Sequence, residues 1–598
     1  MFNLITGRQG SGKSRYIYEN IVRDIKENKD TYLIVPEQYS FEAEKEIIDM
    51  SGMPGIIGIH VLSFSRLSYQ LLNKAGKMQK QPLSKKAALI ILKKILLDLS
   101  DDLTIYSKSA MQDGFCNIML DCIYELKKNK IKCGELNSLS NTQLLKLKMD
   151  EIKKIYESYE AYINNDYYDA EDLIEQASKE VTDGTVFNNT NVYIDGFYTL
   201  DKQRLNLIDC IMKKADNVSF CLTYDTDYER DVFSISEKLK SDMISLAESS
   251  NLKINEIKLS EKIYCANSIK HIEENIFKYS FKKYSAYKNE TLPEVRILNN
   301  IYKEAQHAAG TITELVQSKN LRYKDIAIFS NDLDTYSKII QRVFAQYQIP
   351  YFIDERYDIF HNCLVRMLLS LLSMIDKNNF YYKDVFEFLK TGYSNLNVEE
   401  INRLENYVLK YGVKREEYFC EFKKAHKKDE AFLDEINNIR KKFEEQIKPW
   451  KDKAKTLKTY DKIADLISEI LDDDAVKEKI QQSITFCEDN LLNVQKSIEE
   501  QIADITRENL EFIKYFLKDQ KATIEDFYEV FRQTLNSDNA GVLPISSDCV
   551  IIGDFARSRI SKINTAIIMG AIDGAMPKKL SSEGVFTQKE KQELTQKG

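Results

Sequence analysis

The chain has 598 residues, of which 43% are hydrophobic and 30% are charged, and its net charge is −8. This composition indicates a core-forming globular protein without long disordered tracts, and it excludes a general polycation, so any nucleic-acid path must be a local groove. The ten cysteines lack metal-binding spacing, and no apolar run reaches the ~20 residues of a membrane span. We therefore expect a cytoplasmic protein with reduced thiols.

The first predicted elements are a strand at residues 2–5, a glycine-rich loop, and a helix. The loop, residues 7–14, reads Gly-Arg-Gln-Gly-Ser-Gly-Lys-Ser, the complete G-x-x-x-x-G-K-S pattern of a phosphate-binding loop. Lys13 is expected to reach the β- and γ-phosphates of ATP, and Ser14 to bind Mg²⁺. The alternative is a glycine-rich turn that binds nothing. The predicted ATP-binding residues are Gly7, Arg8, Gln9, Gly10, Ser11, Gly12, Lys13 and Ser14.

Strands and helices then alternate, which implies a parallel sheet. The pattern becomes almost purely helical from about residue 84 to residue 180, and strand character returns afterwards. The first sheet is therefore expected to be interrupted by a helical insertion. Its further predicted strands are residues 32–35, 56–61, 191–195 and 218–223.

The strand at residues 191–195 ends in Asp195, the expected second magnesium ligand beside Ser14. A cap or turn residue is the alternative. Motor ATPases usually place a glutamate at the next position to activate water, but here that residue is Gly196. Losing such a base slows a reaction by about 10²–10⁴. We expect ATP binding with weak or no hydrolysis, and no catalytic residue is assigned, although Asp201 lies nearby.

A second α/β region is predicted from residue 286 onward, and it too is interrupted by a charged helical stretch. The predicted strands are residues 295–298, 326–329, 549–553 and 566–570. The predicted fold is thus α/β with two parallel-sheet cores, each containing a helical insertion. The expected bounds are 1–80 with 185–285 for the first core, 81–184 for its insertion, 286–365 with 540–598 for the second core, and 366–539 for its insertion.

Three groups of residues are candidates for contact with DNA. Hydroxyls and Arg66 could bind the DNA backbone while Phe64 stacks a base, or Phe64 is a core aromatic. Arg557 and Arg559 either face a phosphate or lie in an exposed basic loop. Lysine clusters in the first insertion either contact DNA or form solvated helix faces. The residues concerned are Ser63, Phe64, Ser65, Arg66, Arg557 and Arg559, and the lysines 85, 86, 93, 94, 127, 128, 130 and 132.

The order of these pieces resembles UvrD-type superfamily 1 helicases, and the detailed motifs resemble the AddB family, which contributes one of the two chains of bacterial AddAB helicase–exonucleases. Asp-Gly-Phe at residues 195–197 separates this pattern from true UvrD-like motors, which carry Asp-Glu. The resemblance implies two RecA-like cores. The matching stretches are residues 6–14, 34–38, 61–67, 125–128, 168–173, 193–197, 325–328, 349–354 and 569–577.

The resemblance also implies a role in processing DNA double-strand breaks for recombinational repair. A protein of this family would guide or scan a strand while an AddA-type partner supplies the motor. The family carries a C-terminal nuclease domain and an iron–sulfur cluster, neither of which is expected in this chain, since it stops at Gly598. Asn331 lies where helicases often place an arginine.

Two other classes of function stay open. An active superfamily 1 ATP-dependent DNA helicase is the main alternative, and Gly196 and Asn331 argue against it. A phosphate-loop kinase is the other, but a kinase does not need two paired cores. Tight, salt-dependent binding of single-stranded DNA would favour either helicase-like class over the kinase.

Overall fold

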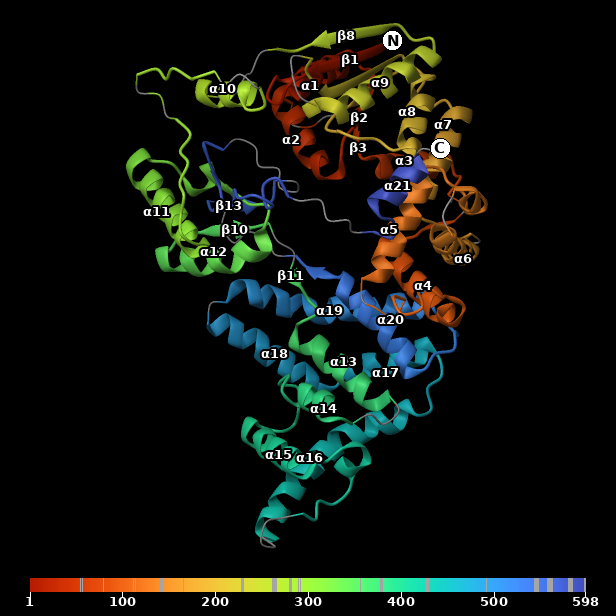
Figure 1. Cartoon of the computed structure of the whole chain (residues 1–598), viewed down its shortest axis with the longest axis vertical. Coiled ribbons are helices and arrows are strands. Elements are labelled where there is room, and N and C mark those ends of the chain that lie inside the picture. The colour runs from red at the N-terminus through yellow and green to blue at the C-terminus, as the bar shows by residue number, and fades with distance from the viewer. Residues whose placement is uncertain are drawn as a thin grey trace.

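The protein is described from a computed structural model, which is elongated, with one parallel sheet at one end and a long helical insertion at the other (Figure 1). Among the parts of the chain that it describes, no helix is both long and apolar enough to cross a membrane. The described residues are 1–53, 55, 58–78, 80–110, 112, 114–139, 143–164, 166–226, 231–260, 266–278, 282–288, 290, 292–354, 357–376, 380–424, 430–490, 492–541, 548–555, 563–578 and 584–595.

The first sheet has six parallel strands in the order β3-β2-β6-β7-β1-β8. Helices cover both faces of this sheet, and its strands are therefore near-continuous apolar runs. Successive side chains along a strand point to opposite faces, so they enter different cores. Leu4 packs in one core and Ile5 in the other. The strands are β1 (Phe2–Gly7), β2 (Asp30–Ile34), β3 (Ile59–Leu62), β6 (Thr190–Ile194), β7 (Asn217–Thr223) and β8 (Ile254–Lys258).

Two helices supply one of these cores and four helices supply the other. The first pair is α1 (Lys13–Lys26) and α2 (Ser40–Ser51). The other four are α3 (Phe64–Lys74), α7 (Ala170–Asp183), α8 (Lys202–Met212) and α9 (Ser234–Ser249). A further helix, α10 (Asn267–Asn275), follows the edge strand β8.

The first helical insertion leaves the sheet after α3 and returns before α7, whereas the sequence prediction extended it to residue 184. A short parallel pair, β4 (Gln81–Pro82) with β5 (Tyr167–Tyr168), joins its two ends. Its helices enclose a core of their own. They are α4 (Lys85–Asp98), α5 (Phe115–Lys128) and α6 (Gln143–Ile163).

The second sheet has four parallel strands in the order β10-β13-β9-β14. Helices α11 (Ile301–Lys319) and α12 (Leu333–Tyr347) pack with it in one core. The chain leaves this sheet after β10 and returns at β13, so the predicted α/β class with two interrupted sheets is confirmed. The strands are β9 (Ile326–Phe329), β10 (Tyr351–Ile353), β13 (Val550–Gly553) and β14 (Thr565–Ile568).

The second insertion is a bundle of eight helices among the described residues, with the largest hydrophobic core of the chain. An antiparallel pair, β11 (Tyr357–Asp358) with β12 (Asn539–Ala540), joins its ends. The helices are α13 (Cys363–Ile375), α14 (Tyr382–Leu389), α15 (Val398–Tyr411), α16 (Glu430–Ala454), α17 (Tyr460–Asp472), α18 (Asp474–Asp489), α19 (Asn493–Phe516) and α20 (Ile524–Ser537).

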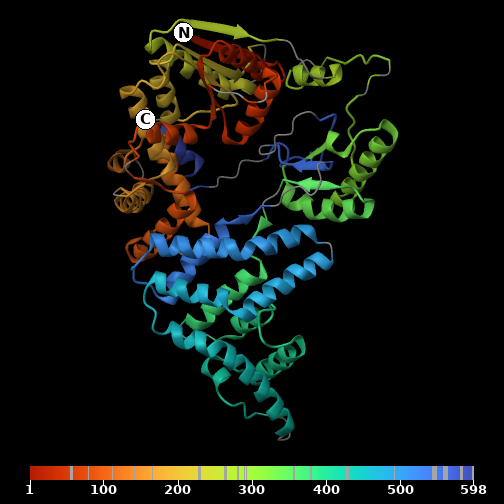
Figure 2. The same cartoon turned by 180° about the vertical axis from the view of Figure 1, so that it is seen from behind.

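The two insertions lie side by side, with α4 against α20, as views from both sides show (Figures 1 and 2). The Lys93 side chain is 1% exposed, and its ammonium lies 3.0 Å from the Glu529 carboxylate. Lys86 lies 2.8 Å from Asp538. These two lysines, predicted to contact DNA or water, therefore hold α4 to α20.

One predicted strand near the middle of the chain is wrong. The predicted strand at residues 295–298 is irregular, with Val295 87% and Ile297 96% exposed, because no described strand lies beside it to complete its backbone hydrogen bonds. The last helix, α21 (Gln588–Thr595), follows Phe586. Phe586 packs in the core of the first insertion, although the sequence prediction placed residues 540–598 in the second core.

Candidate nucleotide-binding site

The glycine-rich loop connects the end of β1, inside the first sheet, to the start of α1. Gly10 and Gly12 have φ of +77° and +82°, a left-handed conformation that glycine adopts without strain. A Cβ atom on Gly7 would lie 2.4 Å from Ser11 Oγ and 2.6 Å from the Leu259 carbonyl oxygen. The loop therefore closes tightly over β1: a side chain on Gly7 would clash, and side chains on Gly10 and Gly12 would strain the backbone.

Lys13 lies inside this loop. Its ammonium donates hydrogen bonds to the carbonyl oxygens of Gly7, at 3.1 Å, and Arg8, at 2.8 Å. Burial lowers the pKa of Lys13, and the nearby Asp195 charge opposes that shift. Ser11 Oγ is buried and has no hydrogen-bond partner in the described part of the chain. The loop thus holds a buried cation and an unsatisfied hydroxyl.

Asp195 follows β6 and meets Ser14 from the start of α1. Its side chain is 8% exposed, accepts a hydrogen bond from Gly196 N at 2.8 Å, and hydrogen-bonds to the Ser14 side chain. Burial raises the pKa of Asp195, while the bonds from Ser14 and Gly196 and the charge of Lys13 oppose the rise. A hydroxyl and a carboxylate side by side are the hard oxygen ligands that Mg²⁺ prefers.

Gly196 is constrained by its surroundings. Its φ is +84°, and a Cβ atom would lie 3.1 Å from Pro36 Cδ and 3.4 Å from Tyr39 Cε1. Asp201, the nearby acid, accepts a hydrogen bond from Arg204 N at 2.9 Å as the N-cap of α8. Neither position presents a carboxylate to the loop.

Arg8 forms ion pairs with two acids. Its Nε lies 2.6 Å from Asp225 Oδ2, after β7, and its Nη1 lies 3.4 Å from Glu273 Oε2, on α10. Lys258 also pairs with Asp225, at 3.3 Å. The sequence analysis missed both acids because they lie 217 and 265 residues from Arg8 and belong to no motif. Gln9, at the tip of the loop, is exposed.

The predicted DNA-contact segment after β3 mostly serves the fold. Ser63 caps α3 by accepting a hydrogen bond from Arg66 N at 3.3 Å. Phe64 is 3% exposed and its ring lies 5.2 Å from that of Phe197, so a base could stack on it only if the ring left the core. Ser65 and Arg66 are exposed, and Arg66 pairs with Glu37 at 3.3 Å.

The remaining residues singled out in the sequence belong to the second half of the chain. Arg557 and Arg559 lie outside the described residues. Asn331 donates a hydrogen bond from Nδ2 to the Ala575 carbonyl oxygen at 3.0 Å. Asn331 thus ties two loops of the second core together.

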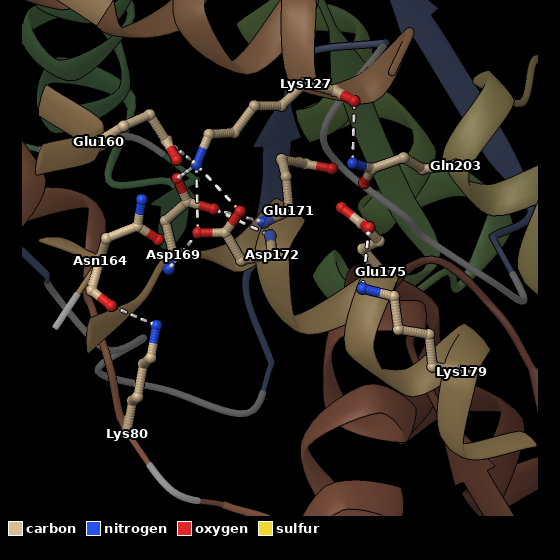
Figure 3. Close-up of polar contacts among 10 residues, drawn as sticks. All are labelled: Lys80, Lys127, Glu160, Asn164, Asp169, Glu171, Asp172, Glu175, Lys179 and Gln203. Carbon is tan, nitrogen blue, oxygen red and sulfur yellow. Dashed lines mark hydrogen bonds and ion pairs between the residues drawn. The ribbon is translucent and has the colours of Figure 1, made fainter. Parts of the chain in front are cut away.

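Lys127, predicted as part of a basic cluster, is buried among three carboxylates where α5, α6 and α7 meet (Figure 3). Its ammonium lies 2.6 Å from Glu160, 2.6 Å from Asp169 and 3.0 Å from Asp172. Burial would lower the pKa of Lys127, but the three carboxylates together raise it. The carboxylates alone have the spacing of a metal site, and the lysine ammonium supplies the cation there.

Two interrupted parallel sheets, with a glycine-rich loop at the end of one strand, define a two-core α/β protein. Residues 4–273 match the family model described as "ADDB, N-terminal". The resemblance to AddB is thereby confirmed.

Curated relatives extend this similarity over the whole chain. The B subunit of the ATP-dependent helicase/deoxyribonuclease of Clostridium novyi is 29% identical over 100% of this chain and 53% of the relative. The proteins of the same name from Alkaliphilus oremlandii and Clostridium kluyveri are 30% and 32% identical, each over 99% of this chain and 54% of the relative. The chain spans about half the length of these relatives.

Proposed function

We propose that this chain is the helicase-like portion of a protein that processes DNA double-strand ends for recombinational repair. In this proposal it binds ATP, guides or scans a strand in the cytoplasm, and relies on an AddA-type partner as the motor. Support comes from the relatives, whose names describe one component of an ATP-dependent helicase/deoxyribonuclease. The chain corresponds to about half of such a component, and no nuclease role or iron–sulfur cluster is assigned to it.

The proposed nucleotide site uses the loop of residues 7–14. Its backbone N–H groups and the N-terminus of α1 would hold the phosphates. The Lys13 ammonium would exchange its two carbonyl partners for phosphate oxygens, which bind it more strongly because they are charged. Ser14 and Asp195 would hold Mg²⁺, which would neutralise phosphate charge when bound.

The observation that carries the non-motor assignment is the backbone at Gly196. A general base at this position would have to occupy a left-handed conformation and press on Pro36. Asp201 caps α8, and residues 197–200 carry no carboxylate, so this segment after Asp195 offers no replacement for the base. We therefore infer binding of ATP with a rate of hydrolysis reduced by about 10²–10⁴ relative to a complete site.

The proposed domain bounds follow the sequence prediction with two changes. We propose first-core residues 1–80 with 169–285, because α7 packs in the core of the first sheet, first-insertion residues 81–168, and second-insertion residues 366–539. The second core would comprise 286–365 with 540–578, because Phe586 packs on the first insertion and Lys148 pairs with Glu590 at 2.8 Å.

The test measures ATP binding and turnover by the purified chain, with and without single-stranded DNA. The unchanged protein should bind Mg²⁺–ATP, and Lys13→Ala should abolish binding. Arg15→Ala is the matched control, because Arg15 lies on the same helix and pairs with Glu19. Turnover should stay at least about 10²-fold below that of a complete motor site, with and without DNA. Vigorous DNA-stimulated turnover would contradict the proposal and favour an active helicase.

A further inference from the structure

The second insertion contains an open cavity of about 750 Å³ that no part of the proposed nucleotide site uses. The end of α16 and the loop before α17 form one side of it, and the loop before α20 forms another. The two loops are bonded together: Ala522 N donates to Lys458 O at 2.9 Å, and Tyr460 N donates to Gln520 O at 3.2 Å. Backbone hydrogen bonds thus hold in place the two loops that form the cavity.

The rim of this cavity is basic in a chain that is acidic overall. Residues 451–458 carry four lysines and one aspartate, whereas the net charge of the chain is −8. Lys458 and Lys521 line the cavity, are exposed, and form no ion pair with any described residue. Lys455 pairs with the exposed Asp452 at 2.8 Å, and the buried Lys451 pairs with Glu416 at 3.0 Å.

Asp526 is the acidic residue that lines the cavity, and its carboxylate is hydrogen-bonded at the N-terminus of α20. Its carboxylate accepts hydrogen bonds from Thr523 N at 2.9 Å and Thr523 Oγ1 at 2.8 Å. Helix α17 also begins at the cavity, and its N-cap residue Thr459 makes no side-chain cap bond. Acids lie in the first turns of both helices, Asp461 on α17 and Asp526 on α20, so the positive charge of the rim comes from the unpaired Lys458 and Lys521.

The remaining lining of the cavity is apolar. A ligand that fits this combination carries both an anionic group and an uncharged, flat or apolar part. Cavities of about 300–1,000 Å³ commonly hold ligands the size of a nucleotide. The apolar lining residues are Ile375, Ala454, Leu457, Ala522 and Ile524.

We propose that this cavity binds nucleotides of single-stranded DNA, with Lys458 and Lys521 on the phosphates and the apolar residues beneath a base or sugar. The inference rests on the proposed function, which brings a DNA strand to this chain. An acidic protein segment is the competing ligand, and DNA is favoured because each nucleotide supplies both the charge and the apolar surface that the cavity matches.

The test is binding of a fluorescent oligothymidylate of about 20 nucleotides, longer than common single-strand sites, to the full chain. The double variant Lys458→Glu/Lys521→Glu is compared with Lys423→Glu/Lys441→Glu, which changes net charge equally at exposed sites of the same insertion outside the cavity. At about 100 mM salt the cavity variant should bind at least about tenfold more weakly, with a salt slope lower by about 1.4 for two lost phosphate contacts. The control should stay within about twofold of the unchanged protein.

A second readout keeps the result independent of folding. In the unchanged chain, the oligothymidylate should protect Lys458 and Lys521, but not Lys423 and Lys441, from acetylation measured by mass spectrometry. Equal weakening in both variants, or no protection, would overturn the cavity assignment. A polyglutamate peptide that protects the same lysines without competition from oligothymidylate would overturn it in favour of a protein ligand. The ATP-binding measurement tests the proposed function separately, so the two failures are distinguishable.

Discussion

Gly196 shows how one residue can decide whether a nucleotide site supports hydrolysis. The position after Asp195 is adjacent to the loop lysine and serine, yet its backbone takes φ +84° and faces Pro36 and Tyr39. A left-handed conformation costs a residue other than glycine about 1–2 kcal/mol. The local backbone at this position therefore disfavours a glutamate, so restoring the side chain alone would not restore a working base.

The first prediction concerns Gly196→Glu. The substitution should lower the free energy of unfolding by about 1–2 kcal/mol and should not produce ATP turnover, because its carboxylate begins from a strained backbone. Denaturant unfolding and a phosphate-release assay measure the two effects. Gly196→Ala is the control, since it carries the same strain without the carboxylate. A stable Gly196→Glu protein with rapid turnover would refute the geometric argument.

The second prediction concerns the acids that hold Arg8. Glu273 places negative charge near Lys13 and pairs with Arg8 of the loop, so its carboxylate competes with phosphate for both cations. In Glu273→Gln, the affinity for Mg²⁺–ATP should rise by up to about fivefold, which corresponds to the loss of a partly exposed ion pair of at most ~1 kcal/mol. Titration with a fluorescent ATP analogue measures this change. Glu274→Gln, on the same helix, should leave the affinity unchanged, and weaker binding by Glu273→Gln would count against the interpretation.

At the scale of elements, a buried ion cluster joins the first insertion to the first core. Lys127 comes from α5, Glu160 from α6, and Asp169 and Asp172 from the start of α7, where Asp169 also caps the helix by accepting from Asp172 N at 2.9 Å. Gln203 of α8 donates to the Lys127 carbonyl oxygen at 2.8 Å. Four helices are therefore positioned by one lysine.

The third prediction removes that lysine. Lys127→Met retains a long apolar stem but leaves three carboxylates without their cation, so the free energy of unfolding should fall by about 3–5 kcal/mol. Thermal or denaturant unfolding provides the measurement. Lys128→Met is the control, because Lys128 is more exposed and lies 3.8 Å from Glu171. Similar losses in both variants would mean that the cluster has no special role.

The fourth prediction concerns the pH dependence of the same cluster. Burial, with the Asp169 charge, raises the pKa of Asp172 from 3.8 to about 7, so one of the three carboxyls retains a proton at acidic pH. Between these values the folded chain binds more protons than the unfolded chain, so this site's contribution to stability is present at low pH and is lost as pH rises through about 7.

Asp172→Asn removes this titration. The melting temperature of the unchanged protein should therefore fall relative to that of Asp172→Asn as pH rises from about 5 to about 8. Asp166→Asn, which alters an exposed acid shortly before α7, should follow the unchanged protein. A constant difference between the unchanged protein and Asp172→Asn across this range would contradict the raised pKa.

At the scale of the whole molecule, local patterns predicted the sheets but not how their insertions meet. The loop at residues 7–14 and the strand before Asp195 were predictable because each depends on contiguous sequence. The roles of Lys93, Lys127 and Arg8 were not, because their acidic partners lie 33 to 436 residues away. Residues 295–298 have strand-forming side chains, yet a strand also requires a neighbour, which sequence pattern alone does not supply.

The last prediction tests the contact between the two insertions. The Lys93 ammonium is buried between α4 and α20, where it bonds to Glu529 and to the Ala110 carbonyl oxygen at 3.4 Å. In Glu529→Gln this buried charge loses its anion, at a cost of about 3–5 kcal/mol. Amide hydrogen exchange should accelerate in α4 and α20 together and stay unchanged in the strands of both sheets. Glu508→Gln, an exposed change on α19, should have no effect. Faster exchange confined to α20 would mean that the insertions do not stabilise each other, and each would then act as an independent appendage of its own sheet.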